Sequence, residues 1–254
     1  MGRTDRTLRR ALLPATLLLA AQLATGCGSD PDPATRAAPG PAARTVPVEA
    51  TDGRIGVLLL GELTGPRMCT ASVVDSPRRN LLVTAAHCVQ SAERGSFDDL
   101  VFAPGYREGR APYGVWPVDT VTVDPRWVAS EDPDYDVAFL TVDEVDGLRI
   151  QDRLGAYRPG FGLGFDLPVT VTGYPHGSGA PVTCSARTTA QSATQERFAC
   201  SGYTVGTSGS PWLTAAGELI GVIGGYQEGG DTDAISYSVA FDQRVANLYH
   251  RAAD

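Results

Sequence analysis

The chain has 254 residues, including 29 glycines and 18 prolines, and a formal net charge of -8. Beyond residue 26 it carries 17 arginines against 28 acidic residues, and this negative balance makes nucleic acid an unexpected partner. The length allows one or two domains, and the many short runs of Val and Thr between turn residues indicate a mostly β structure.

Residues 1–26 are typical of an export signal. The first ten residues carry four arginines, and residues 11–24 form an apolar run too short for a permanent membrane-spanning helix. The run ends in Leu23-Ala24-Thr25-Gly26-Cys27, which resembles the lipobox of bacterial lipoproteins except that Ala24 replaces the usual leucine. We therefore expect acylation of Cys27 and a secreted, extracellular protein anchored by this lipid to the outer face of the bacterial cell membrane. The alternative is an ordinary signal peptide, cut nearby, that leaves Cys27 as a stray thiol.

Residues 27–50 differ in composition from the rest of the chain. They are rich in Pro, Ala, Gly, Asp and Arg and show no apolar periodicity, so they cannot bury enough surface to order themselves. We expect a disordered tether over residues 27–50 and a folded domain over residues 51–254.

Short strand-like runs dominate the folded domain. Three runs joined by hairpins come first, at residues 55–60, 69–74 and 81–84. Further runs follow at residues 114–118, 120–123, 137–142, 169–173, 198–200, 219–223 and 235–239. Strands this short and regular are typical of barrels or of a sandwich. The only predicted helix covers residues 241–252, where one face carries Phe241, Val245, Leu248 and Tyr249.

The five cysteines divide into one at the lipobox and an even set of four. If Cys27 is acylated, two disulfides can form among Cys69, Cys88, Cys184 and Cys200. Of three possible connectivities, the pairing between sequence neighbours is favoured, which joins Cys69 to Cys88 and Cys184 to Cys200. Four reduced thiols would be expected of a cytosolic protein, which contradicts the export signal.

Three segments carry residues suited to nucleophilic hydrolysis. His87 directly follows a hydrophobic strand, Asp136 opens the apolar run 136–140, and Ser208 lies between glycines in Gly206-Thr207-Ser208-Gly209-Ser210-Pro211. Hydrolysis of an amide needs a serine activated by an imidazole, a carboxylate that orients the imidazole, and backbone donors for the oxyanion. We predict His87, Asp136 and Ser208 as this catalytic triad, with the N–H groups of Gly206 and Ser208 as the oxyanion donors.

The segments 84–88, 136–140 and 206–211, in the order His, Asp, Ser, resemble the three signature segments of the trypsin-like peptidases. The serine segment is similar to that of bacterial V8-like enzymes, and the resemblance spans about residues 55–249. It implies an all-β, chymotrypsin-like fold of two antiparallel six-stranded β-barrels, roughly residues 51–150 and 151–238, followed by a C-terminal α-helix. It also implies a monomeric serine endopeptidase that cleaves peptides or proteins and needs no metal or other cofactor.

Two departures from that family concern activation and specificity. Thr207 stands where trypsin-like enzymes often carry the Asp that pairs with a newly cut N-terminal amine. We therefore expect no trypsin-type zymogen switch, although residues 54–57 resemble an activation site. Gly202 stands where trypsins place the Asp that binds Arg or Lys, and Val222 and Ile223 offer no counterpart to the pocket histidine of glutamate-specific relatives. Neither specificity is therefore expected.

Five residues are predicted to bind substrate: Gly202, Tyr203, Gly224, Gly225 and Tyr226. Residues 222–226 would pair with an extended substrate as an added strand. Tyr203 and Tyr226 would line an uncharged pocket that favours apolar or small residues, or would simply pack in the core.

Other interpretations fit the sequence less well. An α/β-hydrolase would combine Ser208 with Asp231 or Asp233 and His250, but the serine segment does not match G-x-S-x-G. A calcium loop starting at Asp132 would need glycine at its sixth position and glutamate at its twelfth. His176 is interpreted as a surface residue, like His250. The remaining alternative is a catalytically inactive, membrane-tethered peptide-binding module with the same fold.

Overall fold

The computed structural model describes residues 40–93 and 95–254. The predicted export signal, its Cys27 and the tether up to residue 39 lie outside the described residues. None of the helices in the described part of the chain combines the length and the apolar character needed to cross a membrane.

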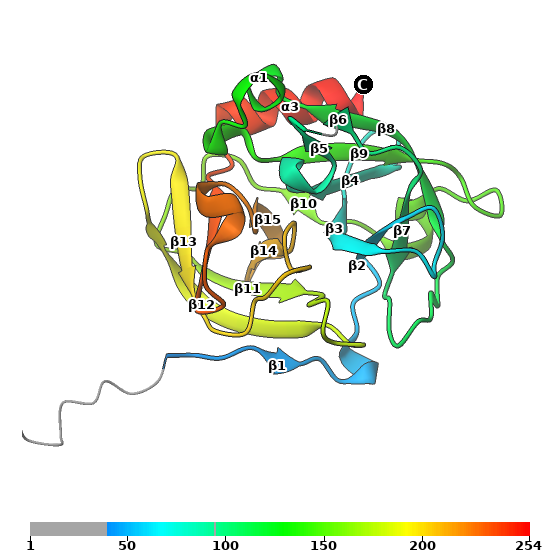
Figure 1. Cartoon of the computed structure of the whole chain (residues 1–254), viewed down its shortest axis with the longest axis horizontal. Helices are drawn as coiled ribbons and strands as arrows, with labels where there is room; N and C mark the ends of the chain where they lie inside the picture. Colours follow the sequence, from blue (N-terminus) through cyan, green and yellow to red (C-terminus); the bar gives the residue numbers. More distant parts are fainter. Residues whose placement is uncertain (1–39, 94) are drawn as a thin grey trace, which may run out of the picture. The chain divides into compact units, whose positions relative to one another are not determined.

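Six antiparallel strands of the first half close into a barrel, drawn in cyan to green in Figure 1. Around the barrel, the order is β2 (Ile55–Leu60), β3 (Arg67–Val74), β4 (Leu81–Thr84), β9 (Ala138–Val142), β8 (Trp116–Val123) and β7 (Leu100–Pro104). Leu58, Phe102, Trp116 and Leu140 pack inside one core cluster with almost no exposed surface. The first predicted six-stranded barrel is therefore confirmed. A short hairpin, β5 (Gln90–Ser91) with β6 (Gly95–Ser96), lies outside it.

The second half forms a sheet whose main path does not close. Its order is β10-β15-β14-β11-β12-β13-β16, with only β10 parallel to its neighbour. The strands are β10 (Arg158–Pro159), β11 (Pro168–Gly173), β12 (Val182–Ala190), β13 (Gln195–Ala199), β14 (Pro211–Thr214), β15 (Glu218–Val222) and β16 (Ile235–Val239). Phe198 and Trp212 pack at its core.

The ends of this second sheet approach each other without forming a ladder. The Val222 N–H donates to the Ser238 hydroxyl at 2.9 Å, and the Gly224 N–H donates to the Tyr237 carbonyl at 3.0 Å. A side-chain hydroxyl thus takes the place of a strand carbonyl between β15 and β16. The chymotrypsin-like fold is confirmed, but the second predicted barrel is a half-barrel.

The predicted C-terminal helix is confirmed as α3 (Gln243–Ala253). It begins after Asp242, whose carboxylate caps the helix by accepting the Arg244 N–H at 2.8 Å. Its apolar face carries Val245 and Leu248 into the core. Two further helices, α1 (Pro125–Ser130) and α2 (Ile150–Leu154), were not predicted, because one and a half turns leave no readable apolar period.

The end of the predicted tether is ordered, which corrects the boundary at residue 50. Strand β1 (Arg44–Thr45), drawn in blue in Figure 1, pairs with β12. The Ala43 N–H donates to the Ser201 carbonyl at 2.7 Å, and a 3-10 turn follows at Val48–Ala50. Backbone pairing at a sheet edge needs no apolar periodicity, so composition did not indicate it. Only Val46 is buried in this stretch.

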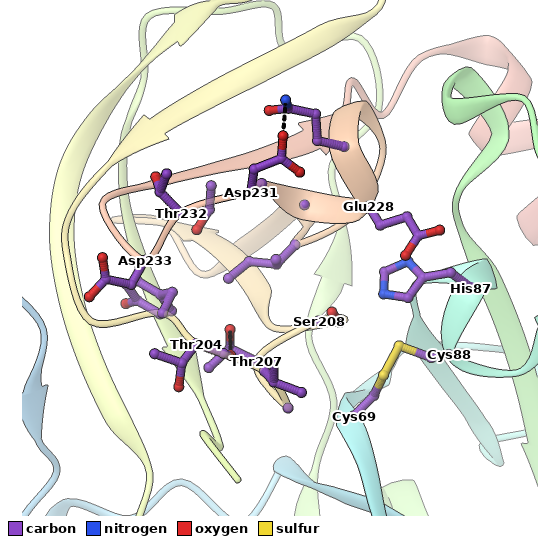
Figure 2. A pocket seen from close by; sticks show the side chains of 18 of the residues that line it. Cys69, His87, Cys88, Thr204, Thr207, Ser208, Glu228, Asp231, Thr232 and Asp233 are labelled. Carbon is purple, nitrogen blue, oxygen red and sulfur yellow. Dashed lines mark hydrogen bonds between the residues drawn. A yellow bond between two sulfur atoms is a disulfide. The ribbon is translucent and has the colours of Figure 1, made fainter. Parts of the chain in front are cut away.

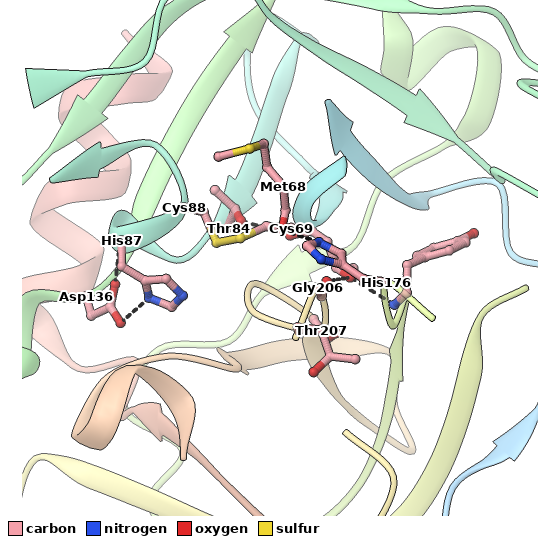
Figure 3. The surroundings of a disulfide bond; sticks show 12 residues. Met68, Cys69, Thr84, His87, Cys88, Asp136, His176, Gly206 and Thr207 are labelled. Carbon is pink, nitrogen blue, oxygen red and sulfur yellow. Dashed lines mark hydrogen bonds and ion pairs between the residues drawn. A yellow bond between two sulfur atoms is a disulfide. The ribbon is translucent and has the colours of Figure 1, made fainter. Parts of the chain in front are cut away.

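Both predicted disulfides form. Cys69 on β3 is bonded to Cys88 after β4, and Cys184 on β12 to Cys200 after β13. The sequence separations of 19 and 16 residues correspond to about 3 kcal/mol of stabilisation each in the chain-entropy account. The first bond closes the turn that carries His87 (Figure 3).

One buried carboxyl makes stability depend on pH. Glu196 on β13 is 2% exposed, and its Oε2 has no hydrogen-bond partner among the described residues. Burial raises the pKa of Glu196 to about 7, although a hydrogen bond with Thr188 opposes the shift. Because the folded-state pKa lies above the unfolded value, the folded state loses stability as pH rises through this range.

We therefore expect Glu196→Gln to raise the free energy of unfolding by about 2–3 kcal/mol at pH 8 and to change it little at pH 4.5. Urea denaturation at both pH values measures this difference. Glu144→Gln, at an exposed ion pair with Arg149, is the matched control and should be neutral at both. An equal effect of Glu196→Gln at both pH values would show that ionisation of Glu196 does not destabilise the folded state.

Candidate active site

His87 is held by Asp136 through two hydrogen bonds. The imidazole Nδ1 lies 2.8 Å from Asp136 Oδ2, and the backbone N–H of His87 donates to Oδ1 at 2.9 Å (Figure 3). His87 lies on a 3-10 turn (Ala86–Cys88) after β4, and Asp136 is fully buried just before β9. A carboxylate at Nδ1 keeps the neutral ring's proton there, so Nε2 is the acceptor nitrogen.

The second sheet supplies the third bond to Asp136. The Gly225 N–H donates to Asp136 Oδ2 at 2.7 Å. A Cβ on Gly224 would lie only 3.0 Å from the same oxygen, so a side chain there would crowd the carboxylate. The buried charge is therefore compensated by three N–H donors from two halves of the domain.

The surroundings of His87 favour its protonated form. Burial of the ring opposes the charge, but the charge of Asp136 and its hydrogen bond outweigh burial, and Glu228 adds a smaller attraction. The pKa of His87 is therefore raised above its ordinary value of 6.5. Glu228 lies beside the imidazole in Figure 2.

Ser208 lines the same cavity as His87, with a volume of about 600 Å³. Ser208 lies on the loop between β13 and β14 and His87 on the first barrel, and Figure 2 shows both side chains at this cavity. The Ser208 carbonyl accepts the Thr70 N–H of β3 at 2.8 Å, which ties the serine loop to the first barrel. Residues 121 positions apart in the chain thus meet at one cavity.

Gly206 also lines this cavity and requires glycine. Its φ is +97°, and a Cβ would lie 2.7 Å from the Tyr174 carbonyl and 2.9 Å from the His176 nitrogen. Its neighbour Thr207 donates its hydroxyl to the Thr204 carbonyl at 2.7 Å within the same loop.

Comparison with known proteins agrees with this geometry. The sequence profile described as "Trypsin-like peptidase domain" matches residues 69–222, more than half of the chain. The chain belongs to this family. No curated protein matches it significantly.

Solved structures show the same fold for this trypsin-like peptidase. Protease Anisep from Arthrobacter nicotinovorans is 23% identical with a TM-score of 0.71, covering 80% of this chain and 96% of that one. The thermostable serine protease AL20 from an extremophilic microorganism is 23% identical with a TM-score of 0.71, covering 82% and 99%. A Glu endopeptidase is 18% identical with a TM-score of 0.69, covering 84% and 97%. At these identities, the likeness shows the chymotrypsin-like fold.

Of the five residues predicted to bind substrate, only Tyr203 lines the cavity. Its buried hydroxyl donates to the Val171 carbonyl at 2.7 Å, so the ring packs in the core as well. Gly224 and Gly225 instead contact Asp136, because β15 ends at Val222.

Gly202 and Tyr226 also lie outside the cavity lining. The Gly202 N–H donates to the Asp233 carbonyl, and the half-exposed Tyr226 ring packs edge-on against Tyr237 at 5.0 Å. Tyr226 begins a 3-10 turn (Tyr226–Gly229) that leads the chain back toward the cavity. The predicted continuous edge strand over residues 222–226 is therefore wrong.

The turn and loop at residues 227–233 form the cavity wall that sequence reasoning missed. They contribute three carboxylates, from Glu228, Asp231 and Asp233, and no arginine of residues 40–93 or 95–254 lines the cavity. The sequence feature that could have indicated this wall is an acidic, glycine-rich run directly after a predicted strand. The pocket of this trypsin-like peptidase is therefore acidic rather than uncharged.

The residues of the α/β-hydrolase and calcium-loop interpretations do not come together in one site. His250 lies on α3 and is absent from the cavity lining, so it forms no triad with Ser208. Asp132 caps the Asp134 N–H, while Asp136 binds His87, so these carboxylates face different partners rather than one calcium ion. Cys69 and Cys88 cluster with His87, but their disulfide removes both sulfurs as metal ligands.

Proposed function

We propose that this protein is a serine endopeptidase in which Ser208 is the nucleophile, His87 the general base and acid, and Asp136 the group that orients the imidazole. One observation carries the proposal: the imidazole bonded to Asp136 and the Ser208 hydroxyl line the same cavity. The Gly206 and Ser208 amides would receive the oxyanion.

The proposed reaction has two stages, acylation and deacylation. The Ser208 oxygen forms a bond to the peptide carbonyl carbon as its proton passes to His87 Nε2. His87 then gives this proton to the leaving amine as the C–N bond breaks, which leaves an acyl-enzyme. Water, deprotonated by the same imidazole, releases the acid product and restores Ser208. The reaction as proposed requires no metal or other cofactor.

The cellular setting is part of the proposal. The two disulfides favour an oxidising, extracellular compartment, in agreement with an export signal over residues 1–26. A lipid on Cys27 would be the only membrane contact, and the enzyme would act as a monomer on peptides or proteins. The acidic cavity wall disfavours glutamate before the scissile bond, since like charges would meet there.

A fluorophosphonate probe tests the proposal against an inactive peptide-binding module. The probe phosphonylates an activated serine, whose oxygen displaces fluoride from phosphorus, so we expect covalent labelling of the wild-type protein and none of Ser208→Ala. Circular dichroism of both proteins serves as the folding control. A folded wild-type protein that resists labelling would favour the binding module instead.

The pH dependence of turnover tests the role of His87. A general base must be neutral, so kcat/KM should rise with pH through a pKa above 6.5. Because the carboxylate of Glu228 helps to raise that pKa, Glu228→Gln should move the acidic limb of the profile to lower pH. Glu49→Gln, an exposed control in the 3-10 turn before β2, should leave the limb in place. An unchanged limb in Glu228→Gln would contradict this electrostatic coupling.

A further inference from the structure

Thr70 is a fully buried residue of β3 that contacts the serine loop of the other half of the domain. Its hydroxyl donates to the Gly206 carbonyl at 3.0 Å and accepts the Tyr174 N–H at 3.0 Å. Its own N–H donates to the Ser208 carbonyl at 2.8 Å. The side chain therefore links two loops of the second half to the first barrel, on both sides of Thr207.

The Tyr174 segment reaches the other side of Gly206. The His176 N–H donates to the Val205 carbonyl at 2.8 Å, and Figure 3 shows His176 beside Gly206. In a trans peptide, the carbonyl and the following N–H point in opposite directions. Holding the Val205 carbonyl on His176 therefore turns the Gly206 N–H away from this segment, and Gly206 lines the catalytic cavity.

Arg67 clamps the same segment from the first barrel. Its guanidinium donates to the carbonyls of Pro175 at 2.9 Å and Ser178 at 2.7 Å, and to that of Tyr174 at 3.2 Å. A planar group with several fixed donors suits this task, because it fixes successive carbonyls at once. The segment that holds Val205 is thus itself fixed at both ends, by Arg67 and by Thr70.

We propose that the Thr70 hydroxyl is a positioning residue for the oxyanion hole, holding both peptide planes around Gly206 in the orientation that presents its N–H to the substrate oxygen. This inference rests on the proposed peptidase function. Thr207 lacks the carboxylate through which trypsin-like enzymes order this loop with a new N-terminus. The Thr70 hydroxyl makes two buried hydrogen bonds between the halves of the domain, to the Gly206 carbonyl and from the Tyr174 N–H, and neither requires a new N-terminus.

Thr70→Val tests the inference, because valine keeps the shape and removes the hydroxyl. We expect kcat per active site to fall about 10- to 100-fold with KM within about twofold, since a displaced donor acts mainly in the transition state. Affinity for a peptide trifluoromethyl ketone, which forms an oxyanion on the nucleophile, should fall by a similar factor. Thr70→Ser should retain kcat within about threefold, which a role in packing alone would not explain.

Thr141→Val is the matched control, a buried threonine of the first barrel whose hydroxyl donates to Asp119 instead. It should keep wild-type kcat. Wild-type kcat in Thr70→Val, or an equal loss in Thr70→Ser, would overturn the inference while leaving the peptidase proposal intact. Absence of turnover in the wild-type protein would overturn the peptidase proposal itself. If Thr70→Val does not fold, Thr70→Ala carries the same comparison with Thr70→Ser.

Discussion

Replacing Ser208 with alanine is expected to lower kcat for peptide hydrolysis by about 10⁶-fold and to leave KM nearly unchanged. Without the hydroxyl no acyl-enzyme can form, and only the oxyanion donors and substrate binding still favour hydrolysis by water. Because Ser208 is partly exposed at the cavity and its side chain has no structural hydrogen bond among the described contacts, the fold should survive. Turnover of a fluorogenic peptide and thermal unfolding measure the two effects.

Ser130→Ala is the matched control for this variant. Ser130 is an exposed serine at the end of α1 that donates to the Arg126 carbonyl, and its replacement should leave kcat at the wild-type value. Residual activity in Ser208→Ala above about 1% of wild type would show that another residue is the nucleophile.

Replacing Asp136 with asparagine is expected to lower kcat by about 10⁴-fold. The two oxygens of Asp136 accept three N–H groups, from His87 twice and from Gly225. An asparagine keeps one oxygen, so its NH₂ group must replace either Oδ1, where it meets the backbone N–H of His87, or Oδ2, where it meets both the ring and the Gly225 N–H. If it faces the ring, His87 carries its proton on Nε2 and can no longer accept one from Ser208. Steady-state kinetics at pH 8 measure the loss.

Asp132→Asn is the matched control, the same substitution four positions earlier. Asp132 caps the Asp134 N–H, and an asparagine side chain can make this bond equally well. We expect normal kcat in this variant. Turnover of Asp136→Asn within about tenfold of wild type would remove Asp136 from the proposed triad.

Local sequence predicted the parts of the site that depend on short segments. His87 follows a buried strand and precedes a disulfide cysteine, and Asp136 precedes another buried strand, so both positions are set by neighbours in the chain. Gly206 could likewise be predicted to need glycine, because its serine segment demands a positive φ. The first barrel followed from runs of apolar residues of strand length.

Several contacts between distant segments were not predicted. Gly225 was expected to bind substrate, yet its N–H holds Asp136, because the chain turns away after β15 rather than continuing as a strand. Polar strands such as β12 carry no apolar run, so the second sheet was incompletely predicted. The proposed role of Thr70 was not predicted either, because it depends on a hydrogen bond to Gly206, 136 positions later in the chain.

The most direct test of the central claim, that His87 and Ser208 act as one unit, is a double-mutant cycle on kcat. The kcat values of His87→Ala, Ser208→Ala and the double variant are compared on one peptide. Each kcat is calculated from the concentration of folded protein, since variants without the nucleophile cannot be titrated at the active site. We expect the double variant to be as slow as either single variant, within about threefold, since removing one member already disables the other. Losses that multiply in the double variant would show that His87 and Ser208 act independently and that they do not form one catalytic unit.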